Sequence, residues 1–179
     1  MNIDFTKKGW HPIFTAYPGT KLLLIGPAPG MKTQEKADVF RDKSGDRLRE
    51  WLGVSEELFY NSGKISVVPL DFYFPGKAKT GDLPPRAGFT KKWHPEVLKL
   101  MPEVDMTVLI GHYAQLYYLG KSVKPTLSET VLSYKDYLPH FFPIPHPSPL
   151  NFRWLNNHPE FEKNITLDLK KKVTQSLIK

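Results

Sequence analysis

His146 is the residue whose type and setting best suit it to chemistry. It lies between two prolines in the run Pro145-His146-Pro147-Ser148-Pro149-Leu150. Proline fixes its own φ and pushes the preceding residue toward an extended conformation, so this histidine has little freedom to move. Its imidazole can donate, accept or carry a proton near neutral pH. We treat it as a candidate catalytic residue, with a structural or surface histidine as the alternative.

A second candidate site is the loop Gly26-Pro27-Ala28-Pro29-Gly30, which directly follows the apolar run 22–25. Glycine lets the backbone approach a ligand closely, but proline has no N–H to donate to a phosphate. This loop also lacks the Gly-Lys-Ser/Thr ending of a nucleotide-binding P-loop. The loop is therefore either the wall of a binding site or a plain turn between a strand and a helix.

Short apolar runs predict the strands that must position these loops. They lie at about 21–26, 65–70, 106–111 and 140–144. Helical patterns alternate with them, which predicts a three-layer α/β/α sandwich with a mostly parallel central sheet of about four strands. The carboxyl ends of parallel strands share one edge, where α/β proteins bind ligands. We therefore expect residues 26–30 and 145–150 to meet there.

Helix signals fill the segments between the strands. Ser44 or Asp46 is predicted to cap a helix that Gly53 ends. Further helices are predicted at about 56–60, 96–101, 112–119 and 126–137, and one long C-terminal helix beginning at Pro159. Residues 1–20, rich in aromatics, are predicted to be an irregular segment laid over the core.

Composition limits the possible classes of protein. The 179 residues, 40% hydrophobic and 24% charged, are typical of a globular protein, and we expect one domain over residues 1–179. No apolar run approaches the roughly 20 residues that span a bilayer, and no secretory signal is evident, so we expect a cytoplasmic protein without a membrane partner. The chain has no cysteine, which excludes disulfides, cysteine nucleophiles and thiolate-held iron–sulfur or zinc sites.

The charge balance favours an anionic partner. The formal net charge is +7 and the pI is about 9.4, which suggests nucleic acid. Segment 71–89 mixes aromatic, Gly and Pro residues with Lys77, Lys79 and Arg86, and is too long for a simple turn. Long loops in compact domains are commonly functional, so these three cations are candidate phosphate contacts.

Two motifs resemble those of the uracil-DNA glycosylase superfamily. Gly26-Pro27-Ala28-Pro29-Gly30 is similar to its first motif and His146-Pro147-Ser148-Pro149-Leu150 to its second. Between them, Phe40-Arg41-Asp42-Lys43-Ser44-Gly45 resembles the stretch after the first motif in the bacterial and archaeal thermophile branches. The resemblance covers about residues 21–155.

The resemblance implies a role for each matching residue. Gly26, Pro27 and Ala28 would wall a pocket for a base extracted from DNA. Phe40 would stack on that base, and His146 would donate to its O2 as the glycosidic bond breaks. Leu150 would fill the gap left in the base stack, and Ser148 would contact a phosphate. The structural alternatives are a core phenylalanine, a loop leucine and a capping serine.

Departures from the family pattern affect the catalytic acid and the base-reading residue. Pro27 and Ala28 stand where many relatives carry an acid or amide that orients water, and neither can move a proton. A branch without that acid has an aspartate in an Asp-x-Ser-Gly stretch, and Asp42 matches it. The asparagine that reads the pyrimidine edge is expected near the end of the second strand, where Ser66 is the nearest polar residue.

Our first interpretation is a monofunctional DNA glycosylase of base excision repair that releases uracil or a related deaminated base. It would act as a monomer on DNA, with no metal, cofactor or iron–sulfur cluster. A second interpretation is a catalytically weak or inactive relative that binds nucleic acid. A third is an α/β enzyme that acts on free nucleosides or nucleotides.

Overall fold

The structure is a computed structural model that describes residues 3–37 and 39–179. Over these residues four strands form one parallel sheet with the order β2-β1-β3-β4. The strands are β1 (Leu22–Ile25), β2 (Ile65–Val67), β3 (Met106–Ile110) and β4 (Phe141–Ile144). The predicted α/β fold with a mostly parallel sheet is confirmed, and the sheet is in fact entirely parallel.

Helices connect the strands and continue beyond them. The α-helices are α1 (Ile3–Lys7), α2 (Met31–Lys36), α3 (Lys43–Leu52), α4 (Glu56–Asn61), α5 (Phe89–Leu98), α6 (Gly111–Leu119), α7 (Leu127–Leu132), α8 (Phe152–Asn157) and α9 (Thr166–Leu177). Short 3-10 turns are η1 (Gly120–Ser122), η2 (Tyr134–Tyr137) and η3 (Pro149–Asn151), and η4 (Phe161–Ile165) is a π-helical turn. Among the described helices none is both long and apolar enough to cross a bilayer.

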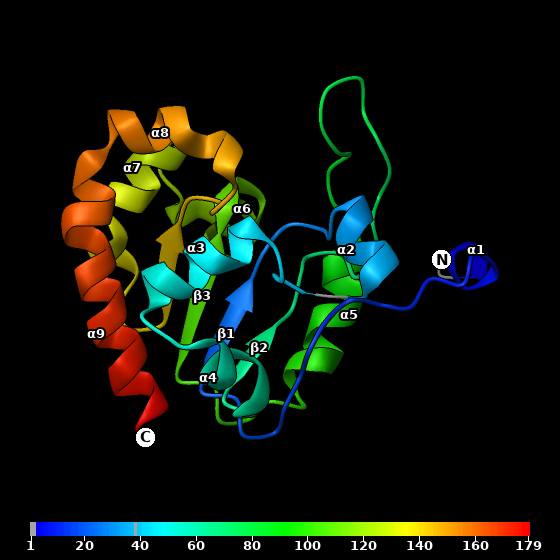
Figure 1. The fold of residues 1–179 in the computed structure, drawn as a ribbon, viewed down its shortest axis with the longest axis horizontal. Helices are drawn as coiled ribbons and strands as arrows, with labels where there is room; N and C mark the ends of the chain where they lie inside the picture. The colour runs from blue at the N-terminus through cyan, green and yellow to red at the C-terminus, as the bar shows by residue number, and fades with distance from the viewer. Residues whose placement is uncertain (1–2, 38) are drawn as a thin grey trace.

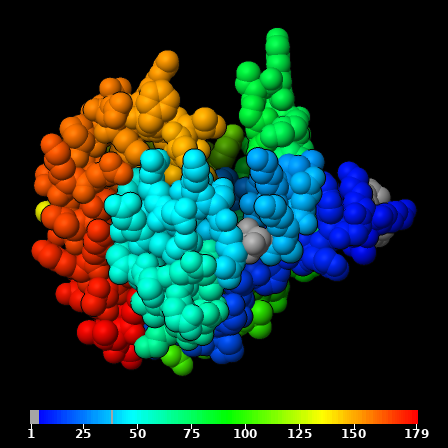
Figure 2. All heavy atoms as spheres, viewed as in Figure 1, coloured from blue at the N-terminus to red at the C-terminus, as the bar shows by residue number. Residues whose placement is uncertain are grey.

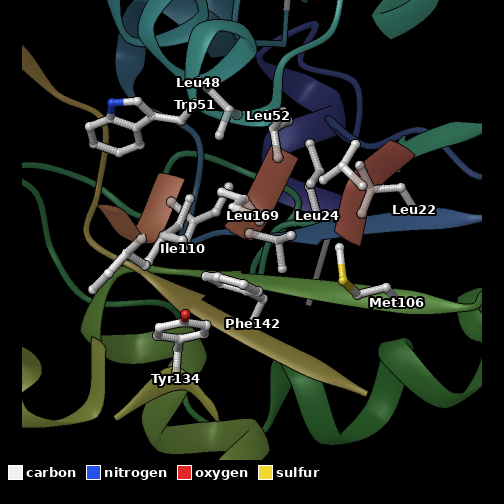
Figure 3. Close-up of a cluster of buried hydrophobic side chains, with 14 of the residues drawn as sticks. Leu22, Leu24, Leu48, Trp51, Leu52, Met106, Ile110, Tyr134, Phe142 and Leu169 are labelled. Atoms are coloured by element: carbon white, nitrogen blue, oxygen red, sulfur yellow. The ribbon is translucent and has the colours of Figure 1, made fainter. Parts of the chain in front are cut away.

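Side chains alternate across the strands and so divide the core into two layers. On one face Leu22 and Leu24 of β1 pack with α3, α4, α7, α8 and α9 (Figure 3). On the other face Leu23 and Ile25 pack with α5, α6 and the aromatic segment after β2. The sheet is therefore buried on both sides, as expected for parallel strands that read as continuous apolar runs.

All four strand arrows in Figure 1 point to the same side of the molecule. This side carries α2, the start of α8 and a green hairpin formed by residues 76–83. The loops after β1 and β4 both open there. The layout meets the expectation that residues 26–30 and 145–150 lie at one edge of the sheet.

Several helices differ from prediction. α5 begins at Phe89 rather than near residue 96 and contains Pro95, because burial of Phe89, His94 and Val97 outweighs the hydrogen bond lost at proline. The predicted 126–137 helix is split into α7 and η2. Helices α1, α2 and α8 were not predicted. Each has only five or six residues, which is too short for an apolar stripe to be recognised.

The C-terminal helix is interrupted at η4, which the simple stripe did not predict. The apolar residues from Phe161 to Leu177 recur every four residues, and each such step rotates about 40° past a full turn of an α-helix. A π-helical turn takes more residues per turn and so removes part of this drift. Phe161, Ile165 and Leu169 thus all stay buried against the sheet.

Candidate active site

A pocket of about 810 Å³ opens at the carboxyl edge of the sheet. It lies in the hollow that Figure 2 shows between the green 76–83 hairpin and the orange segment of η3 and α8. Most of the site residues predicted from the sequence line it. They are Gly26, Pro27, Ala28, Phe40, Asp42, Lys77, His146 and Leu150.

His146 stands at the end of β4 beside the junction of β3 and α6. A Cβ added at Gly111 would lie 3.7 Å from the His146 Cβ. Gly111 has φ +78°, a left-handed conformation that glycine adopts at little cost, and this lets the chain turn into α6 at the pocket wall. The histidine is therefore placed by two neighbouring strand ends as well as by its flanking prolines.

The hydrogen bonds of His146 define its neutral tautomer. The backbone N–H of Ser148 donates to Nδ1 at 3.2 Å. An Nδ1 that accepts carries no proton, so the ring proton sits on Nε2. Burial lowers the pKa of His146, against a smaller opposite effect of the Asp42 carboxylate. At neutral pH the site therefore presents an uncharged imidazole with one N–H donor.

The loop after His146 is held from both ends. The Asn151 side-chain amide donates to the His146 carbonyl at 2.7 Å, and Arg47 of α3 donates to the Ser148 carbonyl at 3.3 Å. The Ser148 hydroxyl accepts from the Leu150 N–H at 3.2 Å, so it caps η3. Leu150 itself is 86% exposed at the pocket mouth. The rigid loop thus supports a projecting leucine.

Phe40 is held in an unusual backbone conformation at the pocket. Its φ is +54°, which bulky residues rarely adopt. Its carbonyl accepts from Tyr60 at 2.7 Å and from Arg49 at 3.1 Å. A Cβ at Gly45 would lie only 1.5 Å from that carbonyl oxygen, so only glycine lets α3 approach this closely. These contacts fix the direction in which the Phe40 ring enters the pocket.

Asp42 is the N-cap of α3, where Ser44 or Asp46 had been predicted. Its Oδ1 accepts from the N–H groups of Ser44 at 3.1 Å and Gly45 at 3.0 Å. The sequence pattern misplaced the cap because aspartate and serine are both favoured at that position. The same carboxylate lines the pocket and acts electrostatically on His146. One side chain therefore both starts the helix and brings negative charge to the site.

Ser66 lies outside the pocket. It is fully buried, its hydroxyl shares a 2.6 Å hydrogen bond with Thr20, and it accepts from the Tyr17 N–H at 3.1 Å. Because side chains alternate along a strand, Ser66 points away when Val67 points in. Val67 and Pro69 line the pocket at this position instead. We therefore assign no base-reading role to Ser66.

The three predicted cations have different surroundings. Lys77 lines the pocket and donates to Asp82 at 2.6 Å in an exposed ion pair. Lys79 is exposed near the tip of the hairpin. Arg86 binds Asp71 through two nitrogens, at 2.6 and 2.7 Å, and Asp71 is fully buried. Arg86 thus holds the loop to the core, and we do not assign it to DNA.

Other pocket residues were not predicted from the motifs. Tyr113 of α6 lines the pocket and is half-exposed, as is Leu83 of the hairpin. Tyr113 follows the end of β3 by three residues, so its place at the sheet edge was a usable signal. No sequence signal marked Arg47 or Asn151, because both bind backbone carbonyls of the His146 loop and Arg47 lies on a different element. No group of three or more potential metal ligands gathers within residues 3–37 and 39–179.

The fold and the pocket define an α/β protein whose ligand site is built from the loops after the first and fourth strands. The family model described as the uracil DNA glycosylase superfamily matches residues 13–170. The chain therefore belongs to this superfamily, whose members act on DNA, usually as glycosylases in repair. The matched range includes all four strands and the pocket-lining motifs.

Proposed function

We propose that this protein is a monofunctional DNA glycosylase that hydrolyses the N-glycosidic bond of uracil or a related deaminated base. The observation that carries the proposal is the convergence of Phe40, Asp42 and His146 on one pocket. A duplex hides the glycosidic bond and the base edge, so such an enzyme must take the base out of the stack. A pocket with an apolar wall beside a projecting leucine suits that task.

His146 supplies the donor for the leaving base. As the glycosidic bond breaks, negative charge builds on the base carbonyl, and the Nε2–H is the one proton that a neutral His146 can offer. A donor aimed at developing charge is worth about 3 kcal/mol, a hundredfold or more in rate. Because the loop and the Ser148 N–H hold the ring, little reorganisation is needed during the reaction.

Asp42 supplies negative charge on the sugar side of the reaction. Both hydrogen bonds described for it end on Oδ1. Oδ2 can then orient the attacking water or offset positive charge in an oxocarbenium-like transition state. Phe40 would hold the extracted base by stacking, at about 1 to 3 kcal/mol. Together these roles need no acid in the loop after β1, where Pro27 and Ala28 stand.

The proposed substrate range is wider than uracil. Val67 and Pro69 occupy the pocket wall at the end of β2, where no side-chain amide is available to read a pyrimidine edge. Selection would then rest on shape, on backbone groups and on the ease with which a mismatched base leaves the helix. Hypoxanthine and xanthine, which also pair poorly after deamination, fall within this range.

A second candidate function is nucleic-acid binding without base excision. It is favoured by the same Pro27 and Ala28, which line the pocket but cannot activate water. Under this alternative Phe40 would hold an extracted base and Asp42 would serve only as the cap of α3. Binding would then persist in the absence of any cleavage.

The test is a single-turnover assay on oligonucleotides that carry uracil, hypoxanthine, xanthine or a thymine mismatch, with free deoxyuridine as a further substrate. We expect strand breaks only after alkali, because a monofunctional enzyme leaves an abasic site. The His146→Ala variant serves as the inactive control. Salt-dependent binding without release of any base would favour the second candidate. Activity on deoxyuridine alone would favour a nucleoside hydrolase and contradict both.

A further inference from the structure

The 76–83 hairpin is a rigid projection from the rim of the pocket. Its two sides are joined by an antiparallel bridge between Lys77 and Asp82 and by their 2.6 Å ion pair. The Leu83 N–H donates to the Gly76 carbonyl at 2.9 Å, and the Ala78 N–H donates to Gly81 at 3.1 Å. Figure 1 shows the hairpin standing clear of the helices beside it.

The base of this hairpin is anchored to the core. Asp71, before it, is fully buried and accepts from the Arg86 side chain and the backbone N–H of Arg86 and Tyr73. The Arg86 guanidinium also stacks on Phe89, 4.5 Å from the ring centroid. A loop tied down at its base this firmly presents its outer residues at a defined place.

Leu83 is the apolar side chain that the hairpin presents to the pocket. It is 43% exposed, and its Cδ1 would lie 3.1 Å from a Cβ at Gly76, so the side chain packs against the opposite side of the hairpin. Both Leu83 and Leu150 line the pocket. The hairpin that carries Leu83 and the η3 segment that carries Leu150 flank the hollow seen in Figure 2. Each rim of the pocket thus presents an exposed leucine.

We propose that the 76–83 hairpin is a second DNA-contacting arm, in which Leu83 packs against the base stack on one side of the extracted nucleotide while Leu150 fills it from the other. The inference rests on the proposed function, because it requires an extracted nucleotide. With this contact, the protein would support the base stack on both sides of the extracted nucleotide.

Charge and continuity favour DNA over a protein as the occupant. Lys77 and Lys79 extend along the same hairpin, and the whole chain carries a net charge of +7. The ion pair between Lys77 and Asp82 is exposed and therefore weak, so Lys77 can leave it for a phosphate while the backbone hydrogen bonds still hold the hairpin together. The arm also borders the proposed base pocket directly.

The experiment uses a duplex with a stable abasic-site analogue and 2-aminopurine placed either 5′ or 3′ of it, since this base brightens when unstacked. We expect Leu83→Ala to remove the response on one flank and Leu150→Ala on the other. Leu83→Ala should also lower duplex affinity by roughly tenfold, as expected for the loss of a buried leucine contact. Leu167→Ala on α9 is the matched control, because Leu167 is 53% exposed against 43% for Leu83, and it should change neither the fluorescence response nor the affinity.

Leu83→Met, which keeps an apolar side chain of similar volume, should restore the lost response and so excludes a misfolded hairpin as the cause. A Leu83→Ala protein that matches Leu167→Ala on both flanks, or a wild type that brightens neither, overturns the proposal. Loss of self-association in Leu83→Ala with an unchanged DNA response would assign the arm to a protein contact and also overturn it.

Uracil cleavage by the same preparations separates the two proposals. Cleavage by wild type with no effect of Leu83→Ala on either flank would leave the glycosylase standing and remove the arm. A Leu83-dependent response without cleavage of any base would support the arm and count against the glycosylase.

Discussion

At the scale of single residues, His146 is expected to make the largest contribution to rate. His146→Ala should reduce single-turnover cleavage by about a hundredfold or more, because its hydrogen bond strengthens mainly as charge reaches the leaving base. Affinity for DNA should change little. Rates with enzyme in excess and binding by anisotropy on the same oligonucleotide give both quantities. Equal losses in rate and affinity would show that the residue acts in binding instead.

Asp42 can be tested without disturbing α3. Asparagine caps helices about as well as aspartate, so Asp42→Asn keeps the bonds to Ser44 and Gly45 but removes the charge. We expect a loss of roughly tenfold to a thousandfold in rate. An unchanged unfolding midpoint in urea is the control for the cap. Full activity in this variant would exclude Asp42 from the mechanism and leave it as a structural residue.

At the scale of elements, the approach of α3 to Phe40 depends on one glycine. Gly45→Ala would drive its Cβ to within 1.5 Å of the Phe40 carbonyl oxygen, so the backbone must shift. We expect a loss of about 1 to 3 kcal/mol in the free energy of unfolding, together with weaker capture of the base. Gly19→Ala, where the nearest atom is 3.8 Å away, is the matched control. Stability equal to that control would mean that the Phe40 loop adapts freely.

α5 is joined to the end of β2 by a buried histidine. His94 Nε2 lies 2.9 Å from the Pro69 carbonyl, which can only accept, so this nitrogen carries the proton. Nδ1 then accepts from the Tyr118 hydroxyl. Burial lowers the pKa of His94, although the bond to Pro69 opposes this. The helix that supports the Pro69 wall therefore depends on a neutral histidine.

This link predicts a pH-dependent stability. Because the pKa of His94 is lower in the folded than in the unfolded chain, its contribution is present above about pH 6.5 and is lost as the pH falls. The loss can reach about 1.4 kcal/mol for each pH unit below 6.5. The His94→Gln protein should be less stable than wild type at pH 7.5. Its stability should fall less than that of wild type between pH 7.5 and 5.5. Thermal midpoints at both values measure this, and parallel declines in the two proteins would contradict it.

At the scale of the whole molecule, the positive charge should set how DNA binding responds to salt. Duplex affinity should fall steeply between about 50 and 200 mM salt, because each neutralised phosphate releases counterions. Lys79→Ala and Lys77→Ala should each reduce the slope of log affinity against log salt by about one. Lys163→Ala in η4, which lies outside the pocket lining, is the comparison. A duplex affinity that does not change with salt concentration would rule out binding through phosphates.

The sequence by itself determined the strands, the loops that follow them and the constraint on His146. Four short apolar runs are enough to predict a buried parallel sheet, and prolines restrict their neighbours wherever the chain folds. The strand and loop pattern, together with the family resemblance, then predicted that residues 26–30 and 145–150 meet at one edge of the sheet. These features depend on residues close in the chain, so they can be read without knowing what packs against them.

Tertiary structure alone decided which side chains face the pocket and which are already paired. Ser66 turns to Thr20 and Arg86 turns to buried Asp71, although both look available in the sequence. Asp42 combines a cap with a place beside His146, and Leu83 reaches the rim on a hairpin that no apolar pattern marks. Such outcomes depend on partners distant in the chain, and a one-residue change of register reverses which face a strand residue takes.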